Sequence, residues 1–207
     1  SMIGMGVGCF AMIVSLSVMN GFETLVHSKL KGFEGDLRVS GHVSENDISE
    51  LDGIEIVMPF MERRGMVEDG NDQKVVSLKA VDVAKMAQFY NLPLRGESPK
   101  MSEVVIGQDL AYRLGKDVGD EIMVYSPIDQ SFGFGLTPKM RMIISGIFST
   151  RILDYDDRFV FLSLHDGKKL FKRKPGLDGI DIRVLKNINI SSLKYNLVQK
   201  LDDSVAI

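Results

Sequence analysis

Few residues of this chain have the types and spacing that chemistry requires. The sequence contains no G-x-S-x-G elbow, no P-loop, no H-E-x-x-H and no C-x-x-C motif. The single cysteine, Cys9, lies in an uncharged apolar run, where a thiol is not an accessible nucleophile. The histidines are far apart in the sequence, which argues against a histidine-rich metal site. The sequence therefore contains almost no candidate for a catalytic constellation.

One acidic cluster, formed by Asp154, Asp156 and Asp157, offers carboxylate oxygens of the kind that bind a cation. The spacing of an EF-hand loop and its terminal glutamate are both absent. Because Arg151 and Arg158 flank the cluster, we favour a solvated turn with local ion pairs over a cation site.

A stronger candidate for function is the segment SPIDQSFGFGLTPK, residues 126–139, between two predicted strands. Loops that connect hairpin strands usually have about two to five residues, so this one is long. Phe132, Phe134 and Leu136 alternate with glycines, so an extended backbone would present all three on one face. Two interpretations stay open: a protruding hairpin that docks on a partner, or a loop that folds back on its own core or forms a mobile tip.

The elements that must position these residues follow from apolar periodicity and turn residues. Predicted strands cover residues 36–41, 54–68, 74–80, 103–106, 121–125, 140–148, 159–163 and 180–185. Predicted helices cover residues 45–51, 82–90, 107–114, 166–172 and 191–201. Because helices and strands mix without a regular β-α-β rhythm, the sequence predicts an α+β fold.

The beginning of the chain differs from the rest, because residues 2–22 carry no charge. A helix of that length spans about 30 Å, the thickness of bilayer hydrocarbon. Its small residues recur at a spacing that lets a second helix approach in lipid: Gly4, Gly8, Ala11 and Ser15. We therefore predict part of a first transmembrane helix at residues 1–22, continued by an amphipathic connecting helix at 23–33, in a fragment of a longer membrane protein.

Three alternatives for the uncharged run are weaker. A signal peptide needs a basic n-region and a cleavage site, and neither is visible. A buried helix of a soluble domain is usually shorter and has a polar face. A dinucleotide-binding loop needs G-x-G-x-x-G after a strand, and no strand can precede these glycines.

Composition sets further limits on the function. The chain has 207 residues, a net charge of −3 and a pI near 5.7, which argues against a general nucleic-acid-binding protein. One cysteine excludes an internal disulfide. Ordinary proportions of charged and hydrophobic residues fit one large domain or two small ones.

Four blocks of the sequence resemble, in order, the LolC/LolE family of lipoprotein-releasing ABC permeases. The first, GVGCFAMIVSLSVMNGFE at residues 6–23, is similar to the family's first transmembrane helix, and its S-V-M-N-G-F run is the most specific part. The others are VVIGQDLAYRLGKDVGDEI at 104–122, SGIFSTRILDYDDRFVFLSLHDGKKLF at 145–171 and GIDIRVL at 179–185.

The resemblance implies a MacB-like periplasmic domain after the first transmembrane helix. Residues 34–75 and 176–207 would form a porter-like subdomain, and residues 76–175 an inserted, β-rich sabre-like subdomain. It also implies an inner-membrane permease with most of this chain in the periplasm, working with a cytoplasmic ATPase subunit and a second permease subunit. Such a permease moves lipoprotein substrates from the inner membrane to a periplasmic carrier, and this subunit would use no cofactor and catalyse no reaction.

Residues 126–139 fall where LolC-type subunits carry the hook, a hairpin that holds the carrier. The partner-binding residues implied by this position are Ile128, Phe132, Phe134, Leu136, Lys139 and Arg141. One alternative is a MacB- or FtsX-like permease domain that contacts an efflux adaptor or a cell-wall hydrolase activator. Another is a membrane-anchored enzyme or solute-binding domain, which would need a deep pocket with convergent titratable groups.

Overall fold

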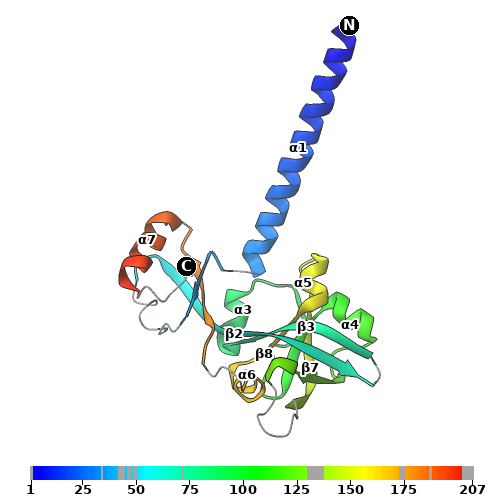
Figure 1. Cartoon of the computed structure of the whole chain (residues 1–207), viewed down its shortest axis with the longest axis vertical. Coiled ribbons are helices and arrows are strands. Elements are labelled where there is room, and N and C mark those ends of the chain that lie inside the picture. Colours follow the sequence, from blue (N-terminus) through cyan, green and yellow to red (C-terminus); the bar gives the residue numbers. More distant parts are fainter. Residues whose placement is uncertain are drawn as a thin grey trace.

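The fold is described from a computed structural model of the chain (Figure 1). The structure describes residues 2–33, 35–41, 45, 48, 51–70, 72–129, 138–172, 176–186 and 188–201, with side chains omitted at 2–5, 22–33 and 153. The helices are α1 (Met2–Phe33), α3 (Val83–Phe89), α4 (Gln108–Leu114), α5 (Leu153–Arg158), α6 (Leu164–Leu170) and α7 (Ile190–Lys200), with a 3₁₀ turn η1 (Pro127–Asp129). The strands are β1 (Leu37–Ser40), β2 (Ile54–Asp69), β3 (Asp72–Val81), β4 (Leu94–Gly96), β5 (Glu103–Gly107), β6 (Glu121–Tyr125), β7 (Lys139–Phe148), β8 (Phe159–Ser163) and β9 (Gly179–Val184).

Six of the strands close into a barrel. Pairing runs in the order β2, β3, β8, β5, β7 and β6, and β6 pairs again with β2 to complete the ring. The β3–β8 and β5–β7 pairs are parallel and the other four are antiparallel. Closure leaves these six strands without an open edge along the ring, so the apolar side chains that point inward share one core.

The remaining part of the sheet extends from β2 as an arm, which we define as β1, β9 and the first half of β2, with α7 packed on it. The first half of β2 pairs with β9, from Ile54↔Val184 to Phe60↔Gly179, and β9 pairs with β1. The second half of β2 pairs with β3 and β6. One continuous strand therefore belongs to both the arm and the barrel.

Among the described residues, three apolar cores correspond to this arrangement. The barrel interior is filled from all six strands, with α4 and α6 adding Leu110 and Leu170. A second core lies around Phe89 and Phe161, where α3 covers the outside of the sheet. The third core joins the arm to α7 through Leu193 and other side chains. The barrel core is covered by α4 and α6, the second core by α3 and the third by α7, so each of these helices has a defined position on the sheet.

Local sequence explains where several helices begin or end and where two strands pack closely. The Asp82 carboxylate accepts a hydrogen bond from the Ala84 N–H and caps α3. Gly115 ends α4 in the left-handed region at φ 62°, where glycine has no steric penalty. A Cβ at Gly65 would lie 2.2 Å from Leu78 Cδ1, so glycine in β2 allows β3 to pack closely.

A network of charged side chains is buried where the arm meets the barrel. Lys79 of β3 places Nζ 2.7 Å from Asp181 Oδ2 of β9, and both side chains are 1% exposed. Arg38 of β1 donates to the other oxygen of Asp181, with Nε 2.6 Å from Oδ1. Lys79 Nζ also lies 5.0 Å from the centre of the Phe60 ring. The Lys79–Asp181 pair thus connects the barrel to the arm across β2.

The α+β fold predicted from the sequence is confirmed, and so are all eight predicted strands as elements. The predicted loop between residues 92 and 100 is wrong in part, because β4 pairs there with β7. The predicted turn at the acidic cluster is the helix α5. Of the predicted helix at 45–51, the structure describes only residues 45, 48 and 51.

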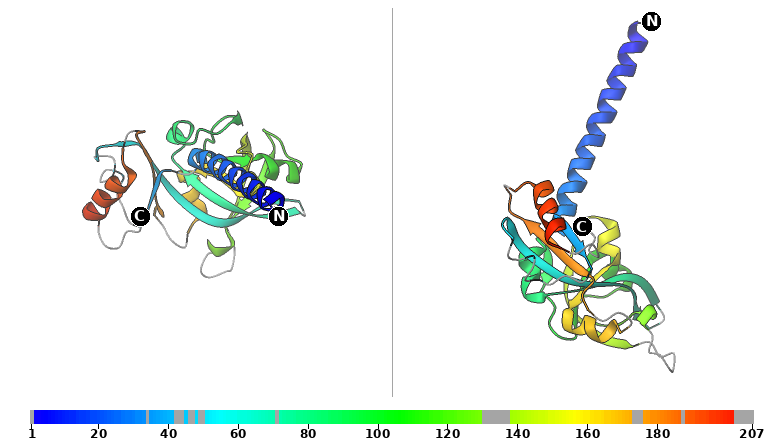
Figure 2. Two further views of the ribbon diagram at one scale, coloured as in Figure 1. Left: turned by 90° about the horizontal axis from the view of Figure 1, so that it is seen from above. Right: turned by 60° about the vertical axis from the view of Figure 1, so that its left-hand side comes forward.

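The helix α1 projects away from the domain in two different views (Figures 1 and 2). It ends at Phe33. Its described side chains, among them Phe10, Ile13 and Val18, are exposed. Within the described residues, none of the helices combines the length and the hydropathy needed to cross a bilayer.

The predicted subdomain boundaries can be located on the fold. The boundary between residues 75 and 76 falls inside β3, and the boundary between 175 and 176 lies just before β9. The division into porter-like and sabre-like subdomains stays a prediction. Since β2 is common to the arm and the barrel, any division of this fold must pass through that strand.

Candidate docking site

The 126–139 segment leaves the barrel between β6 and β7. Its first residues form η1, where Ile128 is 50% exposed, and β7 begins at Lys139. Phe132, Phe134 and Leu136, which the sequence analysis placed on a projecting hairpin, lie outside the described residues. The candidate site is therefore built from the two ends of the segment and the strands that hold them.

Both ends of the segment are fixed. The last pair of the β6–β7 ladder is Tyr125↔Lys139, so the chain departs and returns side by side. On the departing end, the Ser126 hydroxyl donates to Asp129 Oδ2 at 2.7 Å, and both side chains are fully buried. The Asp129 N–H donates to the Ser126 carbonyl at 3.1 Å. These bonds orient η1 and the exposed Ile128 against a rigid base.

The outer face of β2, β6 and β7 continues directly from this base. Residues that pair across neighbouring strands point to the same side of the sheet, and residues two apart along a strand share that side. One row of paired residues across the three strands is Glu68, Met123 and Arg141. The next row on the same side is Met66, Tyr125 and Lys139. We refer to this surface as the hairpin base, formed by Met66, Glu68, Glu121, Met123, Tyr125, Ile128, Lys139, Arg141 and Ile143.

Lys139 is held in place by two neighbours. Its Nζ lies 2.6 Å from Glu68 Oε2 and 4.6 Å from the centre of the Tyr125 ring. The hydrogen bond with Glu68 raises the pKa of Lys139 above its ordinary value, so the side chain keeps its charge. Since Glu68 belongs to β2, the pair bridges β7 to β2 over β6 and stiffens the hairpin base.

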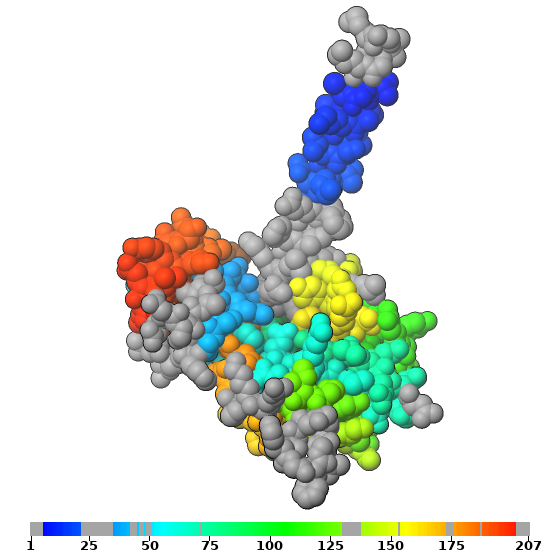
Figure 3. Space-filling model, viewed as in Figure 1, coloured from blue at the N-terminus to red at the C-terminus, as the bar shows by residue number. Residues whose placement is uncertain are grey.

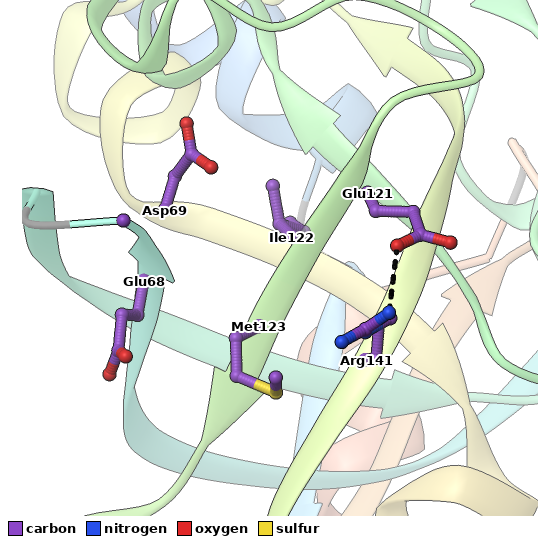
Figure 4. Close-up of a pocket in the computed structure, with 7 residues that line it drawn as sticks. Glu68, Asp69, Glu121, Ile122, Met123 and Arg141 are labelled. Atoms are coloured by element: carbon purple, nitrogen blue, oxygen red, sulfur yellow. Dashed lines mark ion pairs between the residues drawn. The ribbon is translucent and has the colours of Figure 1, made fainter.

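Arg141 lies at the edge of an open polar cavity of about 320 Å³ (Figure 4). Its Nη1 is 3.5 Å from Glu121 Oε2, and both side chains are largely exposed. Glu68 and Asp69 line the opposite side of the cavity, with Met123 between the two sides. Asp69 itself pairs with Lys116 at 3.0 Å. The cavity therefore presents charged side chains around a methionine, and the exposed Arg141–Glu121 pair can exchange partners at little cost.

This arrangement suits binding. Methionine and aliphatic side chains supply adaptable apolar contact, and the exposed charged groups can form hydrogen bonds with a partner. The hairpin base contains no Ser, Cys or His beside a general base. Among the described residues, no group of three or more His, Cys, Asp or Glu side chains is arranged to hold a metal ion.

The acidic cluster of the sequence analysis has a structural role. Asp156, expected in a solvated turn, is only 3% exposed. Its carboxylate accepts hydrogen bonds from the Thr150 N–H, the Thr150 hydroxyl and the Arg151 N–H, at 2.7, 2.7 and 3.0 Å. Asp154 and Asp157 form exposed or partly exposed pairs with Arg158 and Arg113. The cluster thus fixes the turn before α5, and the expectation of a solvated turn was wrong for Asp156.

The structure brings Lys139, Arg141 and Ile128 together at one end of the barrel. The small residues predicted to pack in a membrane lie elsewhere, on α1, where Gly8 has no atom within 4 Å of an added Cβ and Ala11 and Ser15 are exposed. The surroundings of Gly4 lie outside the described residues. Sequence reasoning missed Glu68, Glu121 and Met123, although the alternation in residues 121–125 could have identified the outward positions.

Comparison with known proteins gives a consistent result. The family described as MacB-like periplasmic core domain matches residues 1–199. The lipoprotein-releasing system transmembrane protein LolC of Neisseria meningitidis is 21% identical over 220 residues, covering 96% of this chain and 52% of that protein. LolC of Xylella fastidiosa is 23% identical, covering 89% and 48%. LolE of Haemophilus influenzae is 26% identical, covering 59% and 34%. The chain thus spans about half the length of the first two relatives.

Two solved structures share the fold. The periplasmic region of MacB from Actinobacillus actinomycetemcomitans has a TM-score of 0.55 at 13% identity, covering 86% of this chain and 90% of that one. The extracellular domain of the noncanonic ABC-type transporter YknZ from Gram-positive bacteria also has a TM-score of 0.55, at 12% identity, covering 82% and 97%. Identities this low show similarity of fold alone.

Proposed function

The chain belongs to the MacB-like periplasmic core domain family, and on this premise we propose that it is the periplasmic part of a lipoprotein-releasing ABC permease. The observation that carries the proposal is the similarity to LolC over 96% of the chain. In this role the chain binds and positions other proteins and catalyses no reaction. Its lipoprotein substrates pass from the inner membrane to a periplasmic carrier, and ATP is hydrolysed on a separate cytoplasmic subunit.

The hairpin base and the 126–139 segment form the docking site for the carrier in this proposal. Support comes from the buried Ser126–Asp129 bond and the Lys139–Glu68 pair, which give the segment a rigid origin. Phe132, Phe134 and Leu136 would provide the apolar contact. Arg141, whose charge is exposed at the cavity edge, would pair with a carboxylate of the carrier.

The helix α1 would connect this domain to the membrane. Its exposed apolar side chains support that role, and its stripe of Gly4, Gly8, Ala11 and Ser15 would pack against helices of a second permease subunit. Motion of α1 would reach the sheet directly. Just after α1, the Asp36 N–H donates to the Ile182 carbonyl at 2.8 Å, and the Asp36 carboxylate accepts from the Val184 N–H at 2.9 Å.

A pull-down with purified periplasmic lipoprotein carrier tests the docking site. We expect Phe132→Asp combined with Phe134→Asp to reduce capture at least about tenfold, since apolar anchors dominate such interfaces. Arg141→Glu should weaken capture less and make it less sensitive to salt. The matched control is Tyr112→Asp on α4, because Tyr112 is 87% exposed and lies outside the hairpin base.

Unchanged capture by the double variant would refute the docking role. Identification of the proteins that co-purify with the membrane complex then separates the alternatives. Recovery of an efflux adaptor or a cell-wall hydrolase activator in place of the carrier would reassign the permease to a MacB- or FtsX-like function.

A further inference from the structure

Outside α1, the densest group of exposed apolar side chains among the described residues lies between positions 185 and 198. Five large apolar side chains in this short stretch are 38% to 63% exposed: Leu185, Ile188, Ile190, Tyr195 and Val198. Elsewhere in the described part of the domain, exposed apolar residues are further apart in the sequence, and two of them, Ile128 and Ile143, belong to the hairpin base. Within the stretch, Leu185, Ile188 and Ile190 line one cavity, and exposed apolar side chains that gather in this way usually mark a surface that is covered in the working molecule. We call this surface the 185–198 face.

The 185–198 face begins at the root of α1. Leu185, Ile188 and Ile190 line one cavity of about 310 Å³ together with Asp36, which closely follows α1. The bonds from Asp36 to Ile182 and Val184 hold this junction together. In Figure 1 and in the right-hand view of Figure 2, α7 lies on the side of the domain from which α1 projects. The space-filling view shows α7 at the surface on that side (Figure 3).

The side chains on this face match those of surfaces that lie on a bilayer. Residues 185–201 include Lys186, Lys194 and Lys200 but no Asp or Glu. Lysines extend their ammonium groups toward headgroups, while tyrosine and aliphatic side chains occupy the boundary with the acyl chains. Asp36 and Glu55 line the same cavity, and Asp202 and Asp203 follow in the sequence. Apolar burial would therefore contribute more to the contact than net charge.

We infer that the 185–198 face rests on the membrane surface beside α1, with Leu185, Ile188 and Ile190 at the level of the lipid headgroups. The inference rests on the proposed function, because it takes α1 as the segment that enters the bilayer. A lipid surface is favoured over a protein partner because this face adjoins the root of an exposed apolar helix. The contact would give the arm a second attachment to the membrane and restrict tilting of the domain about residue 35.

Fluorescence quenching in lipid nanodiscs tests the inference. Since Cys9 is the only cysteine, a Cys9→Ser background allows one label at a time, introduced by Ile188→Cys or Tyr195→Cys. The chain is reconstituted with phosphatidylcholine and phosphatidylglycerol, a fraction of which carries a nitroxide on the headgroup. We expect both labels to be quenched at least about twofold more strongly than a label at Tyr112→Cys.

A label introduced by Val14→Cys separates this inference from its premise. In one outcome, acyl-chain nitroxide quenches the label at position 14, while the labels at 188 and 195 are quenched no more than the label at 112. That outcome overturns the contact of the 185–198 face with lipid and leaves the proposed role of α1 standing. No quenching at 14, 188 and 195 overturns both. Energy transfer between labels at 188 on two chains, without lipid quenching, would assign the face to a second copy and overturn the lipid contact.

Discussion

Tyr90 is a titratable residue whose surroundings predict a measurable pH effect. Burial raises the pKa of its phenol well above the usual 10.0, and the negative charge of nearby Asp181 raises it further. The raised value means that the folded chain holds this proton more tightly than the unfolded chain. The resulting stabilisation is fully present below pH 10 and is lost as the pH rises from there toward the folded pKa.

The first prediction concerns Tyr90→Phe. In the wild type, the free energy of unfolding should fall by about 1.4 kcal/mol per pH unit above pH 10 through this group alone. In the variant, the free energy of unfolding should fall less steeply with pH by this amount. Urea unfolding at several alkaline pH values measures both slopes. Equal slopes in the two proteins would show that Tyr90 ionises as easily in the folded chain as in the unfolded one. Tyr112→Phe, at an exposed site, is the control.

The second prediction at this scale concerns Asp156. Asp156→Ala leaves the Thr150 and Arg151 N–H groups without their acceptor, so we expect a loss of about 3 kcal/mol in the free energy of unfolding. Asp154→Ala removes an exposed carboxylate of the same cluster and should cost less than about 0.5 kcal/mol. Denaturant titration of both variants measures the difference, and similar small losses would contradict a structural role for Asp156.

At the scale of elements, the attachment of α1 to β9 depends on Gly35. A Cβ at this position would lie 2.7 Å from the Ile182 carbonyl oxygen, closer than real contacts allow. Gly35→Ala should therefore displace the chain after α1 and break the Asp36–Ile182 bond, while the barrel remains folded. Hydrogen exchange at the amides of residues 36–40 should become at least about tenfold faster.

Gly21→Ala is the matched control for that experiment. Gly21 lies within α1, and an added Cβ there would have no atom within 4 Å. It should leave exchange in β1 unchanged. If Gly35→Ala also leaves it unchanged, the close contact does not fix the end of α1.

Individual elements could be predicted from the sequence because their signals are local. The alternation in residues 103–106 and 159–163 and the turn residues before 74 are enough to specify strands. By contrast, β4 has three residues and is a strand only because β7 lies beside it. The helix α5 forms where Asp156 turns inward, and a count of acidic residues cannot distinguish a buried carboxylate from a solvated one.

At the scale of the whole molecule, the barrel and the arm should unfold together, because β2 is shared and Lys79 pairs with Asp181. Lys79→Met would leave Asp181 buried with only part of its compensating charge, at an expected cost of about 3 kcal/mol. Methyl NMR during urea titration can follow Ile144 in the barrel core and Ile182 in the arm core. We expect one midpoint for both methyls, shifted equally in the variant.

Lys168→Met on the exposed side of α6 is the control for this shift. Separate midpoints for Ile144 and Ile182 in the wild type would show that the arm is an independent unit. A variant midpoint shifted only at Ile182 would show that the charged pair stabilises the arm alone.

The closed barrel and the burial of Lys79 are the features that the sequence could not predict. Lys74 and Lys79 belong to the same predicted strand, yet one is partly exposed and the other is almost fully buried. The difference arises because β9, about a hundred residues later, carries Asp181 to that position. The candidate site likewise has a part that the sequence predicts and a part that it does not. Residues 126–139 could be located by loop length, whereas Glu68 reaches the hairpin base only because β2 pairs with β6.

The pairing order also determines when each strand can find its neighbour as the chain is made. Leu37 in β1 pairs with Ile182, and Ser77 in β3 pairs with Phe159. The early strands therefore cannot complete their native pairing until the late strands have been synthesised. Contacts this far apart in sequence make folding slow. Until β8 and β9 have emerged, β1 and one edge of β3 lack their native neighbours, and a chain that stops before residue 179 has no strand to support β1. Exposed edges of this kind are the sites at which chains associate wrongly. The topology that makes the finished domain rigid therefore leaves the incomplete chain vulnerable to aggregation during its synthesis.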